Sequence, residues 1–236
     1  METRIGLVLP SPNIHMEPQF NALGLEGVTF HATRVMLKET TEAALIAMEK
    51  DLEYAAELLS TIAPAAVGYC CTSGSFIQGS AFDEAIAAAI RRICSCPAVT
   101  TSGSMEGAFR AMGVKSVALV TPYTSDINRA EVRYIESKGF AVASEYGFGI
   151  VDNPTLVALT REQWIDAAIA ADTPEADALF LSCTNTKAMP VADYLEQKLG
   201  KPVLTSNATT LWALLRAVGY EKAVSGCGAL LREHLV

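Results

Sequence analysis

The sequence contains an internal duplication, and this feature constrains the fold more than any other. The segment RIGLVLPSPN near the start aligns with SVALVTPYTS in the second half, and YCCTSGS aligns with LSCTNTK. Pro10 and Pro122 are 112 residues apart, and so are Cys71 and Cys183. Because two independent landmarks share one offset, we expect two related structural units of about 100 residues each, not a solenoid of short repeats.

Each half of the chain alternates short, β-rich apolar segments with segments of helical periodicity. This alternation is typical of parallel sheets covered by helices. We therefore predict an α/β fold with two pseudo-symmetric domains, each a parallel sheet flanked by helices, and an active site in the cleft between them. The predicted strands are residues 4–10, 28–36, 65–70, 97–101, 116–122, 140–150, 176–182 and 202–206. The predicted helices are residues 41–62, 80–93, 104–113, 125–139, 160–171, 190–200 and 207–219.

Composition and charge argue against several kinds of partner. Half of the residues are hydrophobic and only 19% are charged, so the chain can bury a large core. The net charge is −8 and there is no run of Lys or Arg, which argues against nucleic acid as a partner. No apolar run reaches the roughly 18–20 residues of a membrane span, and the apolar start is too short for a signal peptide. We expect a cytoplasmic protein that contacts no membrane.

The sequence indicates neither a metal site nor a nucleotide cofactor. The six cysteines occur as C-C, C-x-C and isolated residues, and the three histidines are scattered. Without a C-x-x-C motif, a zinc site and a thiol–disulfide oxidoreductase are disfavoured. Six cysteines in a chain of this length do not indicate a disulfide framework, and we assume a reducing compartment. No G-x-G-x-x-G motif follows the first predicted strand. We expect no metal and no cofactor.

Cys71 and Cys183 stand at equivalent positions, where a predicted strand ends and a polar turn begins. Ligands bind beyond the carboxyl ends of strands in parallel α/β sheets, so both thiols are candidate catalytic groups. Each is followed by residues that lead into a helix, whose first amides are expected to favour the reactive thiolate. For the other four cysteines, buried packing is the simpler interpretation.

Polar residues near the two cysteines could bind a carboxylate. The turns TSGS and TNT that follow the cysteines offer hydroxyl and amide groups for an anion. The turn after the first strand supplies Asn13, its counterpart in the second half supplies Tyr123, and the loop VDNP supplies Asn153. Taken alone, both asparagines are typical of turns and Tyr123 is typical of packing. The candidate residues in the turns after the cysteines are Thr72, Ser73, Thr184 and Asn185.

Together these motifs resemble the aspartate/glutamate racemase superfamily. Within it, PSPN followed by MEP, VTPYTSDIN, FGIVDN and SCTN are similar to the maleate cis-trans isomerase branch, and the resemblance extends over nearly the whole chain. Arylmalonate decarboxylases share the fold but keep only the second cysteine, so Cys71 argues against that activity. Amino-acid racemases often have NT after the first cysteine, where this sequence has TS.

The resemblance implies cofactor-independent cis-trans isomerisation of maleate to fumarate. Cys71 as a thiolate would add to the alkene, giving a covalent succinyl-like intermediate that can rotate. Cys183 would act as the acid/base partner or steady the intermediate. The resemblance also implies a homodimer whose domains close over a small dicarboxylate. The implied substrate-binding residues are Asn13, Tyr123, Asn153, Thr72, Ser73, Thr184 and Asn185.

The family's crossed connections imply that the helix at 104–113 and the C-terminal helix pack on the opposite domain. We therefore assign residues 1–100 and 207–236 to the first α/β domain, and residues 101–206 to the second.

Three alternatives stay open. The same two thiols could serve an amino-acid racemase or epimerase by proton transfer on opposite faces of a carbon. A further enzyme possibility is a pathway-specific relative, such as the ectoine-utilisation proteins that resemble this branch. A protein of this fold could also bind an anion without catalysis, although binding alone needs no nucleophile.

Overall fold

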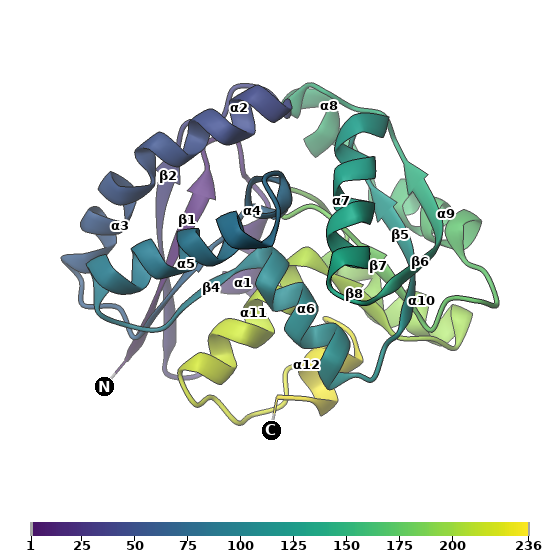
Figure 1. The fold of residues 1–236 in the computed structure, drawn as a ribbon. Coiled ribbons are helices and arrows are strands. Elements are labelled where there is room, and N and C mark those ends of the chain that lie inside the picture. The colour runs from purple at the N-terminus through teal and green to yellow at the C-terminus, as the bar shows by residue number, and fades with distance from the viewer. Residues whose placement is uncertain (1, 236) are drawn as a thin grey trace.

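The computed structural model describes residues 2–235, which form two four-stranded sheets (Figure 1). The strands are β1 (Thr3–Pro10), β2 (Val28–Val35), β3 (Ala66–Tyr69), β4 (Ala98–Thr100), β5 (Ser116–Thr121), β6 (Ala141–Gly147), β7 (Ala178–Leu181) and β8 (Val203–Thr205). Their order is β2-β1-β3-β4 in the first sheet and β6-β5-β7-β8 in the second, and every pairing is parallel. The two sheets have the same topology, and the predicted α/β fold class is confirmed.

Helices flank both sheets and connect successive strands. Four of them, each of five to seven residues, were not predicted, because a helix of fewer than two turns shows little periodicity: α1 (Met16–Ala22), α4 (Thr72–Phe76), α8 (Asn153–Ala158) and α12 (Ala229–Glu233). The predicted helix at 41–62 is divided into α2 (Glu42–Ala47), the 3-10 turn η1 (Met48–Asp51) and α3 (Leu52–Ser60). The others are α5 (Ser80–Cys94), α6 (Thr101–Ala111), α7 (Ser125–Ser137), α9 (Arg161–Ala171), the 3-10 turn η2 (Met189–Val191), α10 (Ala192–Leu199) and α11 (Ser206–Ala217). Within residues 2–235, no helix combines the length and apolar character needed to cross a membrane.

The central strands are buried on both faces, which explains their continuous apolar sequences. Ile5, Leu7 and Val8 of β1 are inaccessible to solvent, as expected where helices cover both sides of a parallel sheet. Parallel strands all end at the same edge of their sheet. The segments that follow β1 and β3 therefore lie together, as do those that follow β5 and β7, and these are the segments that carry the predicted site residues.

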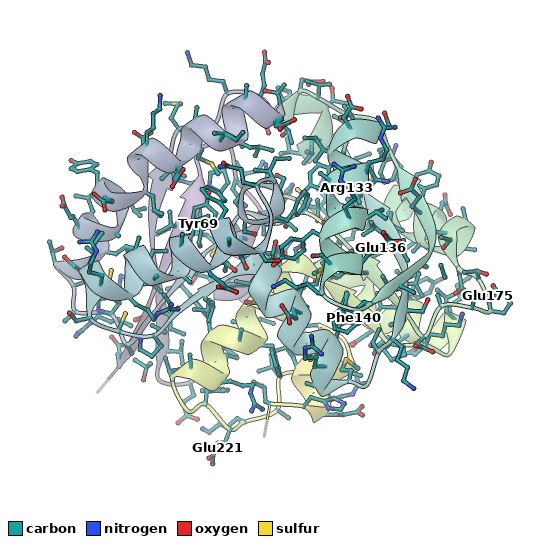
Figure 2. The ribbon with its side chains drawn as sticks, viewed as in Figure 1. Tyr69, Arg133, Glu136, Phe140, Glu175 and Glu221 are labelled. Carbon is teal, nitrogen blue, oxygen red and sulfur yellow. The ribbon has the colours of Figure 1, made fainter. Side chains whose placement is uncertain are left out.

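Two helices, α6 and α11, each follow a strand of one sheet but also pack against the other sheet. α6 follows β4 of the first sheet, yet its Phe109 packs edge-on against Phe180 of β7, with ring centroids 5.3 Å apart. The ring of Phe109 also contacts Phe140, which lies beside α6 in Figure 2. α11 follows β8 of the second sheet, yet its Leu214 lies 3.2 Å from the place that a Cβ on Gly68 of β3 would occupy. Each half of the molecule thus contributes one helix that packs against the sheet of the other half, and these contacts hold the two halves together.

We call each sheet with the helices packed on it a lobe, numbered in chain order. The division that we predicted, with residues 1–100 and 207–236 in one domain and 101–206 in the other, places α6 with the second lobe and α11 with the first. We keep this division as a proposal, which the packing of α6 and α11 supports.

Candidate active site

Cys71 lies two residues after the end of β3 and caps α4 with its sulfur. Its backbone is extended, with φ of −139°, and its Sγ accepts a hydrogen bond from the Gly74 N–H at 3.3 Å. The Ser73 hydroxyl is 3.9 Å from the same sulfur. A Cβ on Gly74 would lie 3.0 Å from Sγ and 2.6 Å from Cε of Met48. Glycine at this position therefore allows the first turn of α4 to approach the thiol.

Cys183 follows β7 in a different backbone conformation. Its φ is +94°, in the region that side chains other than glycine rarely adopt. Its N–H donates to Oγ of Ser206 at 3.0 Å, and its carbonyl accepts from the Thr186 hydroxyl at 3.1 Å. No α-helix begins directly after Cys183, because the chain forms a turn before η2. Both cysteines are followed by residues that lead into a helix, as predicted, but α4 begins immediately after Cys71, whereas residues 184–188 separate Cys183 from η2. Strained backbone of this kind is concentrated at functional sites.

The structure brings the two cysteines and all the other predicted site residues to one cavity between the lobes. The cavity has a volume of about 20 Å³, enough for about one water molecule. The cavity must therefore widen before a larger ligand can enter it. It is lined by Pro10, Pro12, Asn13, Leu37, Thr40, Cys71, Thr72, Ser73, Tyr123, Asn153, Leu156, Cys183, Thr184 and Asn185.

The turns after the first strand and after Cys183 are joined by hydrogen bonds across the cleft. Asn13 Nδ2 donates to Oγ1 of Thr184 at 3.1 Å, while its Oδ1 accepts from the backbone N–H of His15 and of Met16. Asn185 Nδ2 donates in turn to the Pro12 carbonyl at 3.0 Å. Asn13 thus has the turn-forming role that its sequence context suggested, and it also presents its amide nitrogen toward the second lobe.

Tyr123 and Asn153 reach the cavity from the second lobe. Tyr123 is almost fully buried, and its hydroxyl is close enough to the Cys183 sulfur to lower the pKa of that thiol. Asn153 is less buried and donates through Nδ2 to the Lys38 carbonyl at 3.1 Å. The Thr40 N–H donates to the Val151 carbonyl at 3.3 Å beside it. These two contacts join loops of opposite lobes at the edge of the cavity.

Burial sets the protonation of both thiols. It raises the pKa of Cys71 to about 11, although the Gly74 amide and the Ser73 hydroxyl act in the opposite direction. It also raises the pKa of Cys183 to about 12, against the lowering effect of the Asn185 amide and the Tyr123 hydroxyl. The amides lower the pKa as predicted, but desolvation is the larger effect.

Sequence reasoning missed several residues at this site. Thr40 and Leu37 line the cavity from a loop whose sequence, LKETT, has no recognisable motif. Ser206 was assigned to the last residue of a strand, but it begins α11 and its hydroxyl links Cys183 to Thr72, whose Oγ1 donates to it at 2.9 Å. In the part of the chain that the structure describes, no group of three or more His, Cys, Asp or Glu could hold a metal ion.

Comparisons with known proteins identify relatives along the whole chain. The family model for arylmalonate decarboxylase matches residues 5–231. The maleate isomerase of Nocardia farcinica is 31% identical over 98% of this chain and 96% of its own length. The arylmalonate decarboxylase of Bordetella bronchiseptica is 28% identical over 97% of this chain and 96% of its own length.

Two crystal structures show the likeness in three dimensions. A cysteine-to-alanine variant of the maleate isomerase from Pseudomonas putida S16, solved with maleate, matches with a TM-score of 0.95 at 28% identity, covering 100% of both chains. A cysteine-to-serine mutant of the Nocardia farcinica enzyme carries a covalently bound succinylcysteine intermediate and matches with a TM-score of 0.94 at 28% identity, covering 99% of both chains.

Two duplicated parallel α/β lobes with a cysteine from each in one cleft define a protein of the aspartate/glutamate racemase superfamily. Within that class, the chain belongs to the family of arylmalonate decarboxylases and maleate isomerases, as the resemblance predicted. The family contains both an isomerase and a decarboxylase, so membership alone does not decide the reaction.

Proposed function

We propose that the protein isomerises maleate to fumarate through a covalent adduct on Cys71. The observation that carries this proposal is the pair of thiols from opposite lobes, Cys71 and Cys183, in a single cavity. A decarboxylase mechanism with one thiol has no use for the first of them. The maleate-bound and succinylcysteine-bound structures of the relatives support the same chemistry.

In the proposed reaction, Cys71 first loses its proton to solvent, and the resulting thiolate adds to one alkene carbon of maleate. The π electrons form a bond between the neighbouring carbon and a proton supplied by the Cys183 thiol, leaving a succinyl group on Cys71 and a thiolate on Cys183. The former double bond is now single and rotates. Cys183 then removes the proton, the double bond reforms, and Cys71 leaves as thiolate with release of fumarate. No cofactor takes part in these steps.

The remaining predicted residues hold the two carboxylates in this proposal. The side chains of Asn13, Tyr123 and Asn153 and the backbone amides at Thr72, Ser73, Thr184 and Asn185 supply neutral hydrogen-bond donors around the cavity. Donors to a carboxylate that enters a dry site replace the water that it loses. We also propose that the protein is a homodimer, on the strength of the family resemblance.

The test is maleate turnover followed by proton NMR, with variants of two adjacent cysteines. We expect the wild type to convert maleate to fumarate and Cys71→Ala to lose at least about 10³-fold in kcat. Cys70→Ala is the matched control, because Cys70 is also fully buried but bonds the Gly68 carbonyl and does not line the cavity. Unchanged turnover in Cys71→Ala would refute the mechanism.

The same assay separates the alternatives. Loss of carbon dioxide from an arylmalonate without turnover of maleate would favour a decarboxylase. Exchange of an amino-acid α-proton in deuterated water would favour a racemase, and maleate binding without any turnover would favour an anion-binding protein.

A further inference from the structure

A buried carboxyl group lies directly behind Cys183 and belongs to none of the roles above. Glu131, in the middle of α7, is inaccessible to solvent. Its Oε1 accepts a hydrogen bond from the Ser182 hydroxyl at 2.6 Å, and Ser182 immediately precedes Cys183. Among the described residues, no group donates to or accepts from its buried Oε2. A carboxylate with one unpaired oxygen in a dry interior needs an explanation.

No cation compensates this carboxyl group. Arg129 pairs with Asp126 at the protein surface, and Lys138 at the end of α7 pairs with Glu106. None of the described cations contributes to the pKa of Glu131. Burial therefore dominates, and it raises the pKa of Glu131 to about 8, although the Ser182 hydroxyl lowers it. The group is mainly neutral at pH 7.

The titratable neighbours of Glu131 are nearly all acidic. α4, β5 and β7 carry no titratable side chain. Tyr123 and Cys183 are close enough for an ionised Glu131 to raise the pKa of each. The other titratable groups around α7 are Glu145 on β6, bonded to Asn128, the Asp83 carboxyl that accepts from Tyr134, and the Lys138–Glu106 pair.

We propose that Glu131 is a positioning residue whose carboxyl group stays protonated during turnover. It therefore places no negative charge next to Cys183. The cleft can then accept a dicarboxylate dianion and, after proton transfer, a Cys183 thiolate. Ionisation of Glu131 adds a negative charge to a site of low dielectric constant and opposes both anions. The identity of the ligand in this inference rests on the proposed isomerase function.

The first test is the pH dependence of kcat/KM for maleate in the wild type and in Glu131→Gln. The glutamine keeps an oxygen acceptor for Ser182 but cannot ionise. The fraction of Cys71 present as thiolate rises tenfold per pH unit below its pKa of about 11, so we expect kcat/KM of the wild type to rise with pH up to about pH 8. Above pH 8 the ionisation of Glu131 offsets this rise, and kcat/KM is expected to level off. In Glu131→Gln the rise is expected to continue above pH 8, with activity near that of the wild type at pH 7. A variant that levels off at the same pH as the wild type overturns the inference.

The second test does not depend on activity. When folding raises the pKa of a carboxyl group, the free energy of unfolding decreases as the pH rises from the pKa of the unfolded state to that of the folded state. Relative to Glu131→Gln, the wild type is therefore expected to lose thermal stability between about pH 4.5 and pH 8, and to lose no more above that. Glu136→Gln is the matched control, because Glu136 is an exposed glutamate on the same helix (Figure 2).

The two tests separate this inference from the proposed function. A stability difference that does not vary with pH overturns the inference, whatever the activity. If the stability difference follows pH but maleate is not turned over, the proposed function fails, while the neutral state of Glu131 at pH 7 is upheld.

Discussion

At the scale of single residues, the two cysteines differ in how their backbone is held. Cys71 is extended and caps a helix, whereas Cys183 has φ of +94°. A residue with a Cβ in this region costs about 1–3 kcal/mol, and the surrounding hydrogen bonds to Ser206 and Thr186 must hold it there. The turn after Cys183 thereby aims its sulfur at the cavity without help from a helix.

This strain can be measured with two substitutions that both remove the sulfur. Glycine adopts a positive φ freely, whereas alanine does not. We expect Cys183→Gly to be more stable than Cys183→Ala by about 1 kcal/mol in urea unfolding, because relief of the strain outweighs the extra chain entropy of glycine. Equal stability, or a more stable alanine variant, would show that the backbone at Cys183 is not strained.

At the scale of elements, the residues that cap the helices explain why α6 and α11 could be predicted from the sequence and why α4 could not. Thr100 and Thr205 cap α6 and α11 through hydroxyl oxygens, which are common caps, and both helices were predicted to within three residues of their starts. α4 was missed because it has five residues and is capped by the sulfur of Cys71, which is not a usual capping group. The helix that forms one wall of the site therefore has the weakest sequence signal.

The close packing at the start of α4 gives a prediction for Gly74. A Cβ there would lie 2.9 Å from Oη of Tyr69, which is buried in the first lobe (Figure 2), and 3.0 Å from Sγ of Cys71. We expect Gly74→Ala to lose about 1–3 kcal/mol of stability by overpacking, and to lower kcat/KM for maleate because Cys71 is displaced.

The control for this substitution is Gly107→Ala in α6, where the added Cβ would meet only Trp212, at 3.3 Å. Its stability is expected to change by less than about 1 kcal/mol, since alanine also favours the helix. If both variants were equally stable and active, the close contact between the start of α4 and the Cys71 thiol would be shown to matter neither for stability nor for catalysis.

At the scale of the whole molecule, the candidate site lies between two lobes that arose by duplication, and each lobe supplies one of its two cysteines. The offset of 112 residues predicted two lobes, and the equal sheet topologies follow from it. The sequence could also place Asn13 and Cys71 at one sheet edge and Tyr123 and Cys183 at the other. It could not show how the lobes close, because that depends on the LKETT loop, which has no motif and contacts the second lobe through Thr40 with Val151 and Lys38 with Asn153. Nor could it reveal Glu131, whose helix reads as an ordinary amphipathic one.

The central claim is that two lobes present two sulfurs to one dicarboxylate, with Cys71 as the nucleophile. The most direct measurement is the intact mass of Cys183→Ser after incubation with maleate and rapid acid quenching, followed by peptide mapping. In this variant the serine hydroxyl can still give a proton to the strongly basic carbanion that forms on addition. A neutral hydroxyl is a poor base for removing that proton again, so the adduct should accumulate. The account predicts a gain equal to one molecule of maleic acid, located on Cys71. Protein without an adduct, or an adduct that also forms in Cys71→Ala, would contradict it.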